Sequence, residues 1–462
     1  MTEVLLTAPQ ASSGGETIPV FLVAEGDLDG LSPFERGLAA TAEFKGKAGQ
    51  LLAVPGPDGK TARVLFGLGD PAKVEAMLFR GLASRLTVGD YRLEGLPAGL
   101  DPTQVAVAFA LGGYRFDRYR KKRDGRARLV APDGADVAEA REIAHACALA
   151  RDMVNTPAND MGPLQIETIA REIAGRHGAT VSVVAGNDLL EQNYPSIHAV
   201  GRAADPARAP RIVELGWGRP GAPLVALVGK GVVFDTGGLD IKPSAGMRLM
   251  KKDMGGAAHV LALARMIMAA DLPVRLAVLV PAVENAIGGD AMRPGDVLDT
   301  RKGLTVEVGN TDAEGRLILA DALTRAGELE PALTIDLATL TGAARIALGP
   351  QVIPFFTDDE ALAGEIATAS RAVGDPLWRL PLWPGYEEAL DGDVADLKND
   401  PDGWAQAGSV TAGLFLKRFA PAGPWVHLDI FAWNPKGRPG YPVGAEAQAV
   451  RALFAMLRTR FR

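Results

Sequence analysis

Three short apolar runs in this chain are each followed closely by polar residues, and this arrangement restricts the fold more than any other feature. Residues 224–228 precede Lys230, residues 275–281 precede Glu284 and Asn285, and residues 304–308 precede the loop that carries Asp312. Their apolar, β-branched composition predicts buried strands, and helical stretches separate them. Ligands of open α/β sheets gather at the carboxyl ends of strands, so we expect these polar residues to converge on one site.

Two glycine-rich stretches hold the most concentrated ionisable residues. The first is VGKGVVFDTGG (228–238), which runs through IKPS (241–244) to KDMGGAA (252–258), and the second is NTDAEGRL (310–317). Carboxylates with almost no histidine or cysteine favour hard or borderline divalent cations. Four carboxylates balance the charge of two such ions, which leaves Lys242 and Arg316 free to act on a substrate. The pattern predicts a dinuclear hydrolase whose candidate ligands are Lys230, Asp235, Asp253, Asp312 and Glu314.

These two stretches resemble the signature of the cytosolic leucine aminopeptidase family, which comprises dinuclear metallopeptidases. NTDAEGRL matches one half of that signature, and VGKGVVFDTGG with IKPS and DMGGAA matches the other. Weaker similarity runs from about residue 114 to the C-terminus. The resemblance implies a smaller N-terminal α/β domain of macro-domain-like type. It also implies a larger catalytic domain with three α/β/α layers and a mixed central sheet.

The length of the chain also favours two domains, because 462 residues exceed one ordinary core. The N-terminal part alternates expected strands with a helix expected at 74–86, which indicates a small α/β domain. A helix at 137–154 is expected to open the second domain. We therefore predict domains at 1–135 and 136–462. The expected strands of the first are 20–24, 50–54, 62–67 and 105–110.

The resemblance assigns each candidate ligand to a metal ion. It implies that Lys230, Asp235, Asp253 and Glu314 surround one ion, and that Asp235, Asp312 and Glu314 surround the other. Lys230 can bind a metal only as a neutral amine, and two adjacent dications would disfavour its ammonium form. The ions themselves are left open between zinc and manganese, with magnesium and cobalt as further candidates.

Two metal ions can lower the pKa of a bridging water and bind the free amino group of a peptide, which explains exopeptidase action. Lys242 is expected to stabilise the oxyanion that forms at the scissile carbonyl. Arg316 suits bicarbonate, which the family is implied to use as a base. The resemblance implies leucine-like substrates and a pocket formed by Met250, Asn310, Thr339, Leu340 and Gly342.

Composition bears on location and partners. The net charge of −7 argues against a general nucleic-acid binder, and the single cysteine, Cys147, excludes an internal disulfide. No uncharged apolar run approaches a membrane span, and the first residues lack a secretory signal. We expect a cytoplasmic enzyme that acts on peptides. The resemblance adds a homohexamer built as a dimer of trimers.

Two other functions remain open at this point. A dinuclear phosphoesterase would use the carboxylates and Arg316, but such sites usually contain histidines. A DNA-binding or scaffold protein that kept the fold would be favoured by lost ligands, yet all seven candidate metal and catalytic positions carry the expected residue types.

Overall fold

The structure is a computed structural model that describes residues 4–7, 10, 16–121, 125–401 and 406–462. The chain divides into two compact units, Met1–Ala148 with Asn434–Val443, and Leu149–Trp433 with Gly444–Arg462. Helix α5 (Val137–Asn155) confirms the helix expected at 137–154. The domain boundary at residue 135 stays a prediction.

The first unit contains a six-stranded sheet in the order β1-β6-β5-β2-β4-β3. Neighbouring strands are parallel except for β3, which pairs antiparallel with β4. In chain order the strands are β1 (Leu5–Leu6), β2 (Ile18–Ala24), β3 (Leu51–Pro55), β4 (Thr61–Gly69), β5 (Gly89–Glu94) and β6 (Ala127–Val130). Its other α-helices are α2 (Pro33–Thr41), α3 (Arg80–Ala83) and α4 (Pro102–Gly112).

Two of the expectations for this unit need correction. The run 105–110 is not a strand, because it lies inside helix α4. The Asp101 side chain accepts a hydrogen bond from the Thr103 backbone N–H at 2.8 Å and so caps that helix, and Pro102 occupies its first turn. The helix expected at 74–86 is only partly formed, as a 3₁₀ turn (Ala76–Phe79) followed by α3.

The second unit is built on a nine-stranded mixed sheet in the order β16-β15-β18-β14-β9-β11-β8-β7, with β10 also paired to β11. Strands β18, β14, β9 and β11 run parallel, whereas β8 pairs antiparallel with both β11 and β7. In chain order the strands are β7 (Thr180–Ala185), β8 (Arg211–Trp217), β9 (Leu224–Gly229), β10 (Gly231–Asp235), β11 (Arg275–Asn285), β14 (Leu333–Ala338), β15 (Ile353–Phe356), β16 (Leu377–Arg379) and β18 (Trp425–Asp429).

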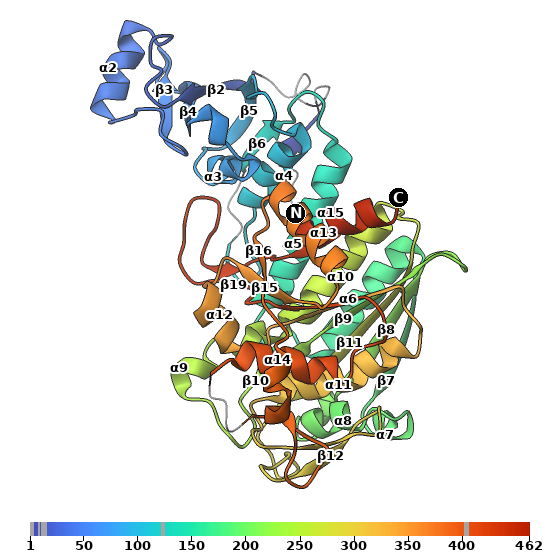
Figure 1. Ribbon diagram of the computed structural model, residues 1–462. Coiled ribbons are helices and arrows are strands. Elements are labelled where there is room, and N and C mark those ends of the chain that lie inside the picture. The colour runs from blue at the N-terminus through green and yellow to red at the C-terminus, as the bar shows by residue number, and fades with distance from the viewer. Residues whose placement is uncertain (1–3, 8–9, 11–15, 122–124, 402–405) are drawn as a thin grey trace. The chain divides into compact units, whose positions relative to one another are not determined.

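Helices cover both faces of this sheet, as Figure 1 shows for α10 and α11 on either side of β9. The α10 face carries α6 (Pro163–His177), α10 (Gly255–Ala269), α13 (Glu360–Val373) and α15 (Val450–Arg460). The opposite face carries α8 (Pro195–Gly201), α11 (Glu314–Gly327) and α14 (Gly408–Lys417). The unit therefore has the expected three layers.

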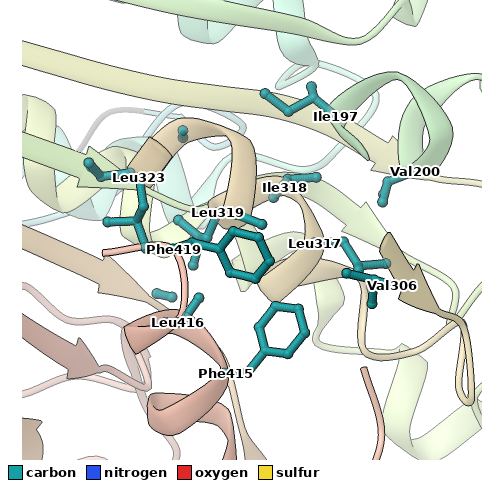
Figure 2. Packing of buried hydrophobic residues seen from close by; sticks show 14 of the residues in the cluster. Ile197, Val200, Val306, Leu317, Ile318, Leu319, Leu323, Phe415, Leu416 and Phe419 are labelled. Atoms are coloured by element: carbon teal, nitrogen blue, oxygen red, sulfur yellow. The ribbon is translucent and has the colours of Figure 1, made fainter. Parts of the chain in front are cut away.

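The core on the α11 face holds the helix that begins with Glu314. Leu317, Leu319 and Leu323 of α11 are fully buried, and they pack with Phe415 of α14 and with Phe419 just after that helix (Figure 2). Burying each leucine contributes about 1.5–3 kcal/mol, so the position of the helix start is well stabilised.

The strand expected at 304–308 is present as β13 (Thr305–Glu307), but it is outside the central sheet. It belongs to a three-stranded sheet with β12 (Val297–Asp299) and β17 (Leu397–Lys398). Within the described residues, no helix is long and apolar enough to cross a membrane.

Candidate metal centre

Lys230 lies directly between strands β9 and β10, and its backbone is held from two sides. Its N–H donates to the Leu337 carbonyl oxygen on β14 at 3.1 Å, and its carbonyl oxygen accepts from the Ala257 N–H on α10 at 2.8 Å. The start of α10 approaches this closely because residue 256 is glycine. A Cβ at residue 256 would lie 2.1 Å from the Leu337 carbonyl oxygen. The second glycine of KDMGGAA is therefore required for α10 to pack this close to β14.

Asp235 ends strand β10, and neighbouring donors fix its carboxylate. Its Oδ1 atom accepts hydrogen bonds from the Gly237 N–H at 2.9 Å and from Asn285 Nδ2 at 2.8 Å. Asn285, at the end of β11, was expected near the site, but no catalytic, binding or metal role was predicted for it. That expectation came from its place after the apolar run 275–281.

Asp253 lies in a 3₁₀ turn (Met250–Met254) that directly precedes α10. Its Oδ1 atom accepts a hydrogen bond from Thr339 Oγ1 at 2.7 Å, and its Oδ2 atom is 2.8 Å from Lys230 Nζ. The carboxylate is therefore oriented by the end of strand β14 and by Lys230, and it is 3% exposed.

The loop that carries Asp312 is held by Asn399, a fully buried residue that the sequence prediction missed. Asn399 Oδ1 accepts from the Gly309 N–H at 2.8 Å, and its Nδ2 donates to the Asn310 carbonyl oxygen at 2.8 Å. The Asn399 carbonyl oxygen also accepts from Arg316 Nη1 at 2.6 Å. One residue outside the motif thus orients both the loop and the first turn of α11.

Two lysines bridge the four carboxylates. Lys230 Nζ lies 2.8 Å from Asp253 and 3.0 Å from Glu314, while Lys242 Nζ lies 2.8 Å from Asp235 and also pairs with Asp312. Burial lowers the pKa of Lys230, but the carboxylates of Asp253 and Glu314 outweigh it, so its pKa is raised overall. Both lysines are therefore charged in this state.

Burial also changes the pKa values of Glu314 and Asp312, and by different amounts. Burial and the Asp235 carboxylate raise the pKa of Glu314 to about 8 and that of Asp312 to about 6. Glu314 Oε2 is buried and accepts no hydrogen bond from the described residues, whereas the buried Glu314 Oε1 and Asp312 Oδ1 atoms are paired with the ammonium groups of Lys230 and Lys242. A buried carboxylate oxygen without a partner is costly, and the other two oxygens already face positive charge, so all three atoms are suited to a bound cation.

A metal ion fits this set of residues. Ligand oxygens of Asp235, Asp312 and Glu314 all lie within 4.8 Å of one another. They line a cavity of about 600 Å³ to which all twelve predicted site residues contribute. These residues are Lys230, Asp235, Lys242, Met250, Asp253, Asn310, Asp312, Glu314, Arg316, Thr339, Leu340 and Gly342. The structure thus brings together all twelve predicted site residues, but Glu284, which was also expected to converge on the site, does not line this cavity and pairs with Arg208.

One wall of the cavity is the loop between β14 and α12 (Gly342–Leu348). Asp429 at the end of β18 holds this loop: its Oδ1 accepts from the Leu340 and Thr341 N–H groups at 3.0 and 3.1 Å, and its Oδ2 accepts from Thr341 Oγ1 at 2.6 Å. Asp429 is 2% exposed and was also missed, because it lies far from the loop in sequence.

Comparisons with known proteins show similarity to aminopeptidases along most of the chain. The catalytic-domain model of the cytosol aminopeptidase family matches residues 148–454, and an M17 aminopeptidase N-terminal domain model matches residues 21–132. A probable cytosol aminopeptidase of Syntrophotalea carbinolica is 41% identical over 447 residues, which cover 90% of this chain and 89% of that protein.

Solved structures with this fold include a cytosol aminopeptidase from Coxiella burnetii, with a TM-score of 0.92 and 43% identity over 99% of this chain and all of that one. The bottromycin maturation enzyme BotP in complex with Mn has a TM-score of 0.88 and 35% identity, covering 97% of this chain and 100% of that one. These similarities confirm the predicted two-domain α/β fold. Because the family match and the relatives extend along most of its length, the chain belongs to the cytosol aminopeptidase family and is a metal-dependent aminopeptidase.

Proposed function

We propose that the enzyme removes leucine-like N-terminal residues from peptides at a centre that holds two divalent ions. The observation that carries this proposal is the cluster of oxygens from Asp235, Asp312 and Glu314 within 4.8 Å of one another in a cavity. Bound ions would supply an activated water and a polarised scissile carbonyl. Zinc and manganese are the proposed ions, and the manganese complex of BotP supports the second.

The proposed ligands divide as the family resemblance implies. Lys230, Asp235, Asp253 and Glu314 would hold one ion, and Asp235, Asp312 and Glu314 the other. The short ion pairs of Lys230 with Asp253 and Glu314 support its inclusion. They show that its amine lies close enough to these carboxylates to bind the same metal ion. To act as a ligand, Lys230 would have to lose its proton as the metal binds.

Lys242 and Arg316 are the proposed catalytic residues. Cations bound to Asp235 and Asp312 would compete with Lys242 for these carboxylates, so its ammonium would be available to stabilise charge on the scissile carbonyl oxygen. Arg316 is buried, and its Nε atom has no acceptor among the described residues. A free donor on a planar guanidinium supports the proposal that Arg316 holds bicarbonate.

The N-terminal side chain of the substrate is proposed to bind against Met250, Thr339 and Gly342, with Asn310 and Leu340 nearby. All five line the same cavity as the carboxylates. Met250 supports a preference for leucine-like or methionine-like residues, because its side chain is apolar and adapts to several shapes.

One assay tests the proposal against its alternatives. The protein, reconstituted with zinc or manganese, is incubated separately with leucyl anilide, a phosphomonoester and labelled duplex DNA. We expect hydrolysis of the anilide alone, loss of that activity with a chelator, and its recovery when metal is returned. Phosphoester hydrolysis, or DNA binding without peptidase activity, would contradict the proposal. No histidine or cysteine occurs among the described residues that line the cavity, which disfavours the phosphoesterase.

Asp429→Asn tests whether the loop between β14 and α12 must be held in place. The amide removes the negative charge and one of the two acceptor oxygens, which weakens the hydrogen bonds to the Leu340 and Thr341 N–H groups at a cost of about 1–3 kcal/mol. We expect a lower melting temperature and a loss in kcat/KM of about tenfold, mostly through KM.

The matched control is Ser409→Ala, which removes only a 3.3 Å hydrogen bond to the same carboxylate. This variant should change the melting temperature and kcat/KM much less than Asp429→Asn does. If Asp429→Asn has the melting temperature and kcat/KM of the native enzyme, Asp429 does not position the pocket.

We also propose a homohexamer built from two trimers and a cytoplasmic location. The relatives named as cytosol aminopeptidases support the location. Sedimentation of the active enzyme as a monomer would contradict the hexamer.

A further inference from the structure

Arg345 is a cation at the cavity that the proposed chemistry does not use. It lies on α12, one turn after Gly342 and therefore on the same side of that helix. Its side chain is exposed and contributes to the lining of the cavity that contains the candidate metal ligands. A positive charge at this position is suited to a ligand that carries a negative charge.

The other cations that line the cavity are paired within the protein or already have a proposed role. Lys230 and Lys242 each pair with two carboxylates, and Lys252 Nζ lies 3.7 Å from Asp253. Arg316 donates to the carbonyl oxygen of Asn399. Arg345 differs, because it forms no ion pair with any carboxylate in the described parts of the chain, including the lining residue Asp400. Its charge is therefore available to a ligand.

The guanidinium of Arg345 is also held in place. Its Cζ atom lies 4.8 Å from the centroid of the Phe431 ring, a cation–π contact. Phe431 is itself fixed, since it is 8% exposed and its N–H donates to Gln448 Oε1 at 3.1 Å. An arginine stacked on an anchored ring loses less conformational entropy when it binds, and its edge remains free for a planar partner.

The start of α12 is anchored as well. Thr341 caps the helix by accepting from the Ala344 N–H at 3.1 Å, and Asp429 holds Thr341. The Cα atom of Arg345 therefore has a fixed place relative to Leu340 and Gly342. A planar donor at a fixed place beside a peptide cavity matches the geometry of carboxylate recognition.

We propose that Arg345 is a specificity-determining residue that binds a carboxylate of the peptide substrate. The inference rests on the proposed peptidase function and adds to it a preference for acidic peptides. The carboxylate can come from the side chain of the first residue, from that of the second, or from the free C-terminus of a dipeptide. These sources share one chemistry, and substrates can separate them.

The test uses three pairs of peptides that differ in one charge. The pairs are Glu-Ala-amide with Gln-Ala-amide, Leu-Glu-amide with Leu-Gln-amide, and Leu-Ala with Leu-Ala-amide. The quantity measured is the ratio of kcat/KM for the charged member to that for its neutral partner, at low and high salt. The variants are Arg345→Met, Arg345→Lys and, as the control, Arg219→Met, which removes the same charge from an exposed site outside the cavity.

We expect at least one ratio to fall by about five- to tenfold in Arg345→Met, through KM, and to fall less in Arg345→Lys, which keeps the charge but not the planar fork. High salt should lower that ratio in the native enzyme, because salt screens an exposed ion pair. Arg219→Met should leave all three ratios unchanged. Ratios in Arg345→Met equal to the native ones in all three pairs would overturn the inference. Failure of the native enzyme on every neutral peptide would instead contradict the proposed function.

Discussion

Glu314→Gln is expected to lower kcat/KM for a leucyl substrate by at least about 10³-fold, more than the loss of a single transition-state donor usually costs. The reason is that Glu314 is the proposed bridging ligand, and an amide is a weaker ligand for a divalent cation than a carboxylate. The same variant should bind less metal, which metal analysis after dialysis would measure. Full activity with normal metal content would show that Glu314 is not a ligand.

The stability of the metal-free protein provides a second measurement for this variant. The folded-state pKa of Glu314 is about 8, above its ordinary value of 4.5, so the folded protein keeps a proton that the unfolded chain releases. The free energy of unfolding should therefore decrease as the pH rises from about 5 to 8. Glutamine has no such proton, so the metal-free variant should lose less stability over this range.

A matched control for the first prediction is Glu328→Gln at the end of the same helix. Glu328 pairs with Arg301 and Arg325 at a more exposed position and does not line the cavity. Its replacement should change stability by no more than about 1 kcal/mol and leave metal content and activity unchanged.

Gly315→Ala is expected to have the next largest effect, although it adds only one methyl group. The new Cβ would lie 2.6 Å from both Cε and Nζ of Lys230, so the lysine must move away from Asp253 and Glu314. We expect a loss of activity of at least about 10²-fold. We also expect a decrease of about 1–3 kcal/mol in the free energy of unfolding, as for other over-packed sites. Kinetics and thermal unfolding of the metal-loaded enzyme would measure both.

Gly327→Ala, at the other end of α11, is the control. Its Cβ would have its nearest neighbour at 3.6 Å, in the Pro421 backbone, which is ordinary contact. Alanine favours helix over glycine by up to about 1 kcal/mol, so this variant should be at least as stable as the native protein and equally active. Native kinetics in Gly315→Ala would remove Lys230 from the proposed ligand set.

The site was more predictable than the fold around it. Short motifs carry Lys230, Asp235, Asp253, Asp312 and Glu314, and the ends of β9 and β10 place Lys230 and Asp235 at the edge where open α/β sheets bind ligands. The first unit was less predictable, since the apolar run 105–110 has the composition of a buried strand and of a buried helix alike. Asp101 and Pro102, just before it, were the local signals that favoured the helix.

What the sequence could not reveal was the support of the site by distant residues. Asn399 holds the Asp312 loop and Asp429 holds the β14–α12 loop, each from about 90 residues away. Strand β13 shows the same limit, because its residues predict a strand but not the separate sheet that it joins. These contacts depend on the tertiary fold, and no local pattern encodes them.

The lysines that pair with the four carboxylates have a consequence for how the enzyme matures. Four acidic groups crowded together would repel one another in a newly made chain, but Lys230 and Lys242 supply internal counter-charges. The polypeptide can therefore reach its final shape before any ion is delivered. Metal binding would then replace the Lys242 ammonium and the Lys230 proton at a site that has already folded.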